Sequence, residues 1–281
     1  MTHTKARTLV AGAVTALTAV LMATPAFAVN ITRSSDNPAY DVIGVNGNAA
    51  PGFATGSFQA NGSTRTEINI GANELFGGSP VTIGDLAALS FWTNQAPQST
   101  PVNWYVNVYT LKDDLNDDGF YGRRLNFEPI YADNRNEQDN VWTQWSTDGT
   151  ENRLRVFDAN RGDSGPVFGT HTDPFLSDLT SGPVNWSDYS SAYEDALVDY
   201  RDEEISYISI ATGSGWADGF SGLIDGFGID WRDGNGGLNS SSINLEAAGG
   251  APVGVPEPST WVFALLVFLG LGYAATKRRD H

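Results

Sequence analysis

The amino-acid sequence predicts an all-β protein, with a single antiparallel β-sandwich of the jelly-roll or lectin-like kind between a signal peptide and a short transmembrane helix. Short runs rich in Val, Ile, Tyr, Phe and Trp are separated by clusters of Gly, Asn, Asp and Pro, as strands are separated by turns. The 31 glycines among 281 residues fit a chain with many turns and few helices. Residues 102–109 also alternate in polarity with a period of two, which indicates a strand with one buried face.

The first element, residues 1–28, is predicted to be a secretory signal peptide. Lys5 and Arg7 precede an apolar stretch at 9–22, and Ala26 and Ala28 supply the small residues of a cleavage site. An N-terminal membrane anchor is the less favoured alternative, because the apolar run is short and the small-residue site follows it. The chain has no cysteine, so neither disulfides nor thiolate chemistry are expected in the exported protein.

The body is expected at 29–246, and its clearest strand is 102–109. One face of this strand carries Val102, Trp104, Val106 and Val108. We expect that face to lie against a core, with Asn103 and Asn107 pointing towards solvent or polar partners. The other predicted strands are 40–45, 53–60, 65–70, 86–93, 126–131, 153–157, 205–212, 223–229 and 243–246.

Few helices are expected in the body. The best candidates are 174–179 and 189–200, the second with Asp188 as its N-cap. After the last strand, residues 247–255 are rich in Gly and Ala and predict a flexible stalk.

The C-terminal segment 256–281 combines three features in a fixed order. Pro256, Glu257 and Pro258 come first, an apolar run follows, and Lys277, Arg278 and Arg279 stand just before the end. A transmembrane helix is predicted at 261–276. As a helix the apolar run rises about 22 Å against a hydrocarbon core of about 30 Å, and snorkelling of the basic side chains makes up part of the difference. The basic residues should act as a membrane stop on the cytoplasmic side.

This order of motif, apolar run and basic stop resembles the PEP-CTERM sorting signal of Gram-negative bacteria, also known as the ice-binding protein C-terminal domain. The resemblance covers about a tenth of the chain. It implies export through the inner membrane, a membrane-tethered precursor, processing by an exosortase-type enzyme, and delivery to the cell-envelope surface or the extracellular matrix. The alternative is an ordinary single-pass anchor. Stretches at 124–129, 212–216 and 222–227 are similar to parts of other PEP-CTERM ectodomains, which carry no activity to transfer.

The charge balance limits the partners of the body. The chain has 33 Asp and Glu against 16 Lys and Arg, for a formal net charge of −17. Such a surface repels nucleic acid and anionic lipid, so no nucleic-acid partner is expected. It fits high-salt surroundings or the binding of divalent cations.

A calcium site is one candidate for the body. Asp114, Asn116 and Asp118 alternate before Gly119, which supplies oxygen ligands and a sharp turn. Leu125 stands where an EF-hand has its bidentate acid, so that type of site is not expected. A looser Ca²⁺ site between two strands and an ordinary solvated loop both remain open, and Ca²⁺ is the only cofactor considered.

A sugar site is the second candidate. Exposed tryptophan rings stack on sugar rings, and Trp142 and Trp145 form the most lectin-like local cluster. The alternative is that these tryptophans belong to the sandwich core. Asp225 shares its phase with apolar neighbours, so we expect a buried carboxylate that caps a neighbouring loop.

Catalysis is not expected. Residues 162–166 are similar to the segment around a serine-protease nucleophile, but His171 is the only histidine outside the two ends, and it follows Ser164 too closely. The leading expectation is a non-catalytic cell-surface or matrix protein associated with exopolysaccharide. The alternatives are a carbohydrate-binding module, with calcium assistance as an option, and a secreted glycan hydrolase.

Overall fold

The computed structural model describes residues 28–62, 65–97, 102–112, 120–159, 169–191, 193, 195, 197–213 and 220–248. The predicted calcium ligands Asp114, Asn116 and Asp118 lie outside these ranges, as do Ser164, Ala26 of the cleavage site and the whole tail with its sorting motif and apolar run. In the part of the chain that is described, no helix is long and apolar enough to cross a membrane.

The larger sheet has seven strands and is built around β13. On one side, β13 pairs with β5 along its length, and β5 in turn pairs with β8. On its other side, β13 pairs first with β3 and then with β14, and these two lead to β2 and β1 respectively. The strands are β1 (Ala28–Ser34), β2 (Val42–Asn46), β3 (Gly56–Ala60), β5 (Leu86–Asn94), β8 (Thr143–Ser146), β13 (Leu223–Arg232) and β14 (Leu238–Glu246).

The smaller sheet has five antiparallel strands in the order β4-β12-β6-β7-β9. Its strands are β4 (Glu67–Gly71), β6 (Tyr105–Thr110), β7 (Arg124–Phe127), β9 (Val156–Asp158) and β12 (Ile205–Ala211). A two-stranded hairpin joins β10 (Val184–Asn185) to β11 (Leu197–Val198). The remaining elements are short: α1 (Ala72–Leu75), α2 (Leu176–Ser181) and the 3-10 turns η1 (Ile83–Asp85), η2 (Pro129–Tyr131) and η3 (Trp186–Asp188).

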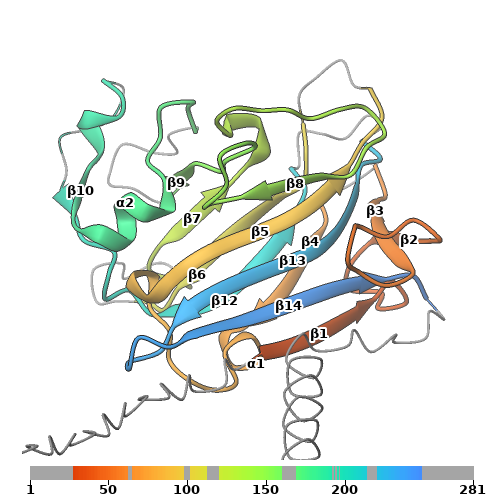
Figure 1. Ribbon diagram of the computed structural model, residues 1–281, viewed down its shortest axis with the longest axis horizontal. Coiled ribbons are helices and arrows are strands. Elements are labelled where there is room, and N and C mark those ends of the chain that lie inside the picture. Colours follow the sequence, from red (N-terminus) through yellow and green to blue (C-terminus); the bar gives the residue numbers. More distant parts are fainter. Residues whose placement is uncertain are drawn as a thin grey trace, which may run out of the picture.

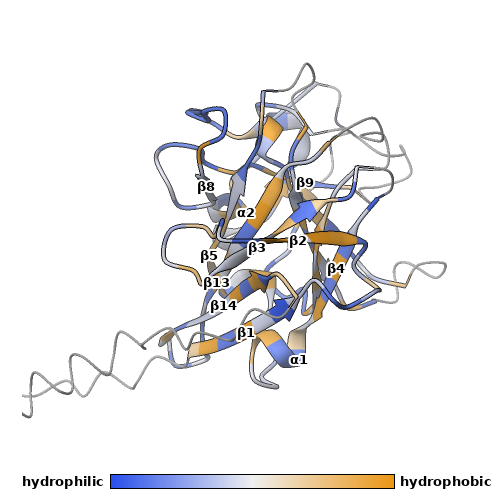
Figure 2. Ribbon diagram, turned by 90° about the vertical axis from the view of Figure 1, so that its right-hand side faces the viewer, coloured by the Kyte–Doolittle hydropathy of each residue, from blue (hydrophilic) through white to orange (hydrophobic). Residues whose placement is uncertain are grey.

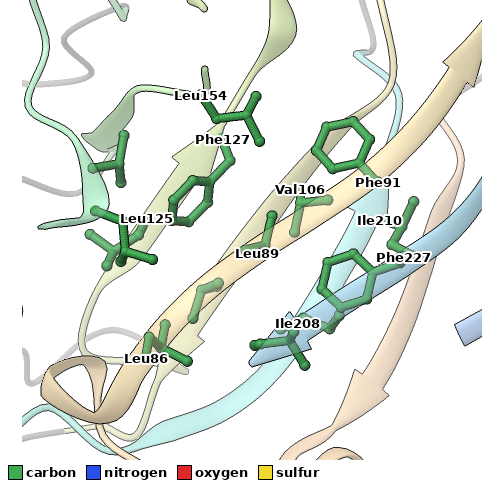
Figure 3. Packing of buried hydrophobic residues seen from close by; sticks show 14 of the residues in the cluster. Leu86, Leu89, Phe91, Val106, Leu125, Phe127, Leu154, Ile208, Ile210 and Phe227 are labelled. Carbon is green, nitrogen blue, oxygen red and sulfur yellow. The ribbon is translucent and has the colours of Figure 1, made fainter. Parts of the chain in front are cut away.

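The two sheets pack face to face, with the larger sheet in front of the smaller one in Figure 1. In the side view of Figure 2, β5, β13 and β14 lie on one side of the molecule and β4 on the other. Figure 3 shows the side chains that fill the space between them. Those from the larger sheet include Leu89, Phe91 and Phe227, and those from the smaller sheet include Val106, Leu125, Phe127, Ile208 and Ile210.

The prediction of an all-β body is confirmed, and so is the inward face of the strand at 102–109. Trp104, Val106 and Val108 have no exposed surface, and Val102 packs against the same cluster. On the other face, Asn103 and Asn107 are buried rather than exposed, and both have polar partners. One pairing departs from the expected antiparallel sandwich, because β1 runs parallel to β14.

Several element boundaries differ from the predictions. The helix expected at 189–200 is wrong: the described residues there are non-helical, and β11 lies within that range. The aromatic residues of this range serve tertiary packing instead, since Trp186 of η3 donates to the Tyr200 hydroxyl over 2.9 Å and packs edge-on against Tyr193. The helix expected at 174–179 is found as α2, two residues later.

Two further differences concern strands. The strand expected at 126–131 ends at Phe127 because Pro129 begins η2. Two strands were not predicted from the sequence: β1, whose first residue is the predicted cleavage residue Ala28, and β8.

Candidate functional site

The outer face of the larger sheet carries two tryptophans, one on β5 and one directly before its neighbour β8. Trp92 lies on β5 between Phe91 and Thr93, which both point inwards and are buried. The strand alternation therefore turns the Trp92 ring outwards, opposite Gln144 of β8. Trp142 precedes β8 by one residue. Both tryptophans are half-buried, so part of each indole is accessible.

A shallow groove of about 330 Å³ runs between these two indoles. Its polar lining is dominated by four side-chain amides, those of Asn136, Gln138, Gln144 and Asn152. Glu151 is the one charged side chain in this lining. In a chain with a net charge of −17, a groove lined mainly by amides and indoles is distinctive.

A second groove of about 320 Å³ adjoins the first. It is also lined by four amides, from Asn48, Gln59, Asn94 and Asn140, and no charged side chain lines it. The Trp142 indole N–H donates to the Asn48 side-chain oxygen over 3.0 Å, which connects the walls of the two grooves. Together the two linings form a polar surface beside Trp142 in which Glu151 is the single charged side chain.

The backbone conformation at three asparagines shapes the loops that carry these amides. Asn134, Asn140 and Asn152 all have positive φ, a conformation that asparagine tolerates better than most residues. The Asn136 backbone N–H donates to the Asn152 side chain over 2.7 Å, and the Asn140 N–H donates to the Gln95 carbonyl over 2.7 Å. The asparagines therefore shape the loop as well as line the grooves.

The expected pair of sugar-stacking tryptophans is not formed. Trp142 borders the groove, but Trp145 is fully buried and donates its indole N–H to the Thr93 hydroxyl over 2.8 Å. The alternative that placed Trp145 in the core is therefore correct for this residue. Trp92 takes the second position in the groove. In the sequence, the position of Trp92 between two residues of the same strand that face the core could have indicated that its ring points outwards.

Asp225 lies beneath a loop of the larger sheet rather than in a groove. Its carboxylate is fully buried and accepts backbone N–H groups from Ala50, Gly226 and Leu245 over 2.7–3.1 Å. Burial raises its pKa to about 6, although these hydrogen bonds oppose that rise. The carboxylate thus fixes the 47–55 loop, as expected of a structural cap.

The described residues contain no group of three or more His, Cys, Asp or Glu placed to hold a metal ion. His171 is exposed and contacts the edge of the Tyr131 ring. No protein-family model matches the chain, and comparisons with curated proteins and with solved structures find no similar protein. The resemblance to PEP-CTERM proteins therefore depends on the order of features in the tail and on the three short body stretches alone.

Proposed function

We propose that the protein is an exported, non-catalytic cell-surface or matrix protein whose body binds a neutral glycan in the groove beside Trp142. The observation that carries this proposal is the combination of two accessible indoles with eight amides in two adjoining grooves. Indole faces pack against the apolar face of a sugar ring. A side-chain amide carries both donors and an acceptor, and those not used within the protein match the hydroxyl groups around that ring.

The lining favours binding without catalysis and a ligand without charge. Glycoside hydrolysis uses a pair of carboxyl groups across the scissile bond, whereas Glu151 is the single carboxylate of these two linings. A neutral ligand fits because the grooves hold no cation to pair with an acidic sugar. We also propose that the two-sheet body belongs to the jelly-roll or lectin-like class of sandwiches, with the parallel β1–β14 pair as a local variation.

Export and sorting form the second part of the proposal. The signal peptide at 1–28 and the tail at 256–281 would direct the protein through the inner membrane to an exosortase-type enzyme, and then to the envelope surface or an exopolysaccharide matrix. The support for this part is the order of the Pro-Glu-Pro motif, the apolar run and the basic stop.

The test of glycan binding uses full-length protein, an array of neutral glycans and calorimetric titration of the glycans that bind. The Trp142→Ala variant should bind at least about tenfold more weakly, because it loses one stacking face and the contact to Asn48. Phe120→Ala, which removes a fully exposed aromatic ring outside the grooves, is the matched control and should bind normally.

Repeating the titration with a chelator tests calcium assistance separately. Absence of any neutral glycan ligand, or equal binding by Trp142→Ala, would contradict the proposed site.

A further inference from the structure

A second set of polar side chains lies on the opposite side of the molecule, on the outer face of the smaller sheet. Strand β7 places Arg124 and Asn126 on this face, and Glu128 follows in the same phase just beyond its end. The neighbouring strand β6 presents Asn107 and Tyr109. The register pairs Asn107 with Asn126 and Tyr109 with Arg124, so the side chains of the two strands lie next to one another.

The two asparagines leave hydrogen-bonding capacity unused. Asn107 is 1% exposed and Asn126 is 7% exposed. The Asn126 amide donates to the Asn107 oxygen over 3.0 Å. This bond leaves the Asn107 Nδ2 donor and the Asn126 Oδ1 acceptor buried without a partner. Turning both amides over exchanges their roles but still leaves one donor and one acceptor unpaired.

The unpaired Asn107 donor and the unpaired Asn126 acceptor belong to neighbouring side chains. A single group that both accepts and donates a hydrogen bond can therefore satisfy both. A hydroxyl can accept from the first amide and donate to the second, whereas a carbonyl, a carboxylate or an ammonium group can do only one of these. Because unpaired buried polar groups cost stability, a ligand or a water molecule that bonds to both would offset that cost.

Arg124 adds a charge to this face. Its Nε is buried without a partner, and the guanidinium makes no ion pair within the described residues. An unpaired guanidinium is unexpected in a chain that has twice as many acids as bases. It lies beside Tyr109, whose ring stacks on Tyr207 at 4.3 Å between centroids. A planar guanidinium with free N–H groups is the side chain best suited to bind a carboxylate.

Glu128 lies near the other end of the same face. Its carboxyl group is half-buried and has no hydrogen bond or ion pair in the described part of the chain, and burial raises its pKa to about 7. Below that pH the group is neutral, so it does not repel an anionic ligand and it can donate a hydrogen bond.

We propose that this face binds an acidic glycan, with a uronate carboxylate on the Arg124 guanidinium and a ring hydroxyl between the Asn107 and Asn126 amides. The charge of Arg124 selects an anionic sugar, and the unpaired amide donor and acceptor select a hydroxyl beside it. This site lies on the opposite sheet from the Trp142 groove (Figure 1), and it depends on different residues.

The test titrates full-length protein at pH 6 with an oligogalacturonate, and with a neutral cello-oligosaccharide of equal length. Arg124→Gln should bind the oligogalacturonate at least about tenfold more weakly, because it loses the charge-assisted pair. Arg232→Gln, which changes an exposed arginine of the larger sheet, is the matched control and should bind normally.

A second variant, Asn107→Leu with Asn126→Leu, separates ligand binding from a structural role. It should also lose oligogalacturonate binding, while its melting temperature should stay level or rise because the unpaired groups are gone. Normal binding together with a lower melting temperature would show that the amides hold a structural water, and would overturn the proposal.

Two further results would overturn it. The first is no oligogalacturonate binding by the wild-type protein at millimolar concentration. The second is binding that Trp142→Ala abolishes and Arg124→Gln leaves unchanged, which would place every glycan in the groove of the larger sheet. Loss of neutral-glycan binding in Trp142→Ala, with oligogalacturonate binding intact, would support two separate sites.

Discussion

Glu128 makes the stability of this protein depend on pH in a way that one substitution should remove. The residue follows β7 and precedes the 3-10 turn that begins at Pro129. Its carboxylate is close enough to Tyr105 and Tyr131 to raise the pKa of both hydroxyls, although burial is the larger cause for each. Burial raises the pKa of Glu128 itself from 4.5 to about 7, because no cation or donor offsets the loss of solvent.

The direction of this pH dependence follows from how tightly the folded and the unfolded protein bind the Glu128 proton. The folded protein holds the Glu128 proton more tightly than the unfolded chain does. The corresponding stability is therefore fully present below pH 4.5 and is lost as the pH rises through about 7. One pKa unit corresponds to about 1.4 kcal/mol, so the full loss is about 3 kcal/mol, and nearer to about 2 kcal/mol after allowance for the remaining solvent contact of the group.

Glu128→Gln keeps the shape of the side chain and is neutral at every pH. Its free energy of unfolding should match that of the wild type near pH 4 and exceed it by about 2–3 kcal/mol at pH 8. Urea unfolding followed by tryptophan fluorescence, repeated from pH 4 to pH 8, measures this difference directly.

Asp139→Asn removes an exposed carboxylate and serves as the matched control, with a curve expected to parallel the wild type. Parallel curves for Glu128→Gln and the wild type would refute the reasoning. So would a variant that is less stable at pH 8, since that would mean that the ionised carboxylate has a stabilising partner.

The remaining predictions concern a glycine of the larger sheet and the tail. Gly226 has φ of +61°, and a Cβ there would lie 2.4 Å from the Phe53 ring, so Gly226→Ala should destabilise the protein by about 2–3 kcal/mol in thermal melts. Gly52→Ala, with φ of +87° and open space around it, should cost only about 1 kcal/mol, and equal costs would exclude the steric contribution. Alanine replacement of the Pro-Glu-Pro motif at 256–258 should leave an uncleaved precursor in the inner membrane of the native host, because alanine removes the restriction by which proline disfavours helix and favours the extended backbone that a processing enzyme would bind. Mass analysis of the C-terminus is the readout, and wild-type protein that retains residues 261–281 at steady state would contradict this prediction.

Local patterns were sufficient to identify the side chains that face the core. The alternation at 102–109 placed Trp104, Val106 and Val108 correctly, but it did not show that Asn103 and Asn107 on the other face are buried as well. The helix prediction failed at 189–200, where Tyr193 and Tyr200 pack against Trp186 of η3 instead. Tyr200 shows why: its hydroxyl accepts from Trp186 and donates to Asp158 over 3.0 Å, and neither partner can be inferred from the local sequence.

The candidate sites were harder to predict because both depend on the pairing of strands. Trp92 and Trp142 share a groove because β5 pairs with β8, and 50 positions of sequence separate them. Asn107 and Asn126 meet because β6 pairs with β7 in a particular register. A shift by one residue would turn one asparagine to the core face, and no local pattern fixes that register. The predicted calcium ligands remain a prediction, since they lie outside the described residues.

The two faces differ in a way that bears on a matrix role. The larger sheet presents amides and indoles with one carboxylate. The smaller sheet presents the Arg124 guanidinium, which makes no ion pair within the described residues, and at the other end of that face a carboxyl group that is neutral below about pH 7. The closely packed core between the sheets separates the two faces (Figure 3). Two separate glycan sites on opposite sheets would therefore let one molecule hold a neutral chain and an acidic chain at once. Linking two binding events in this way raises overall avidity without strengthening either contact. A non-catalytic protein could then organise a mixed polysaccharide layer by bridging its chains.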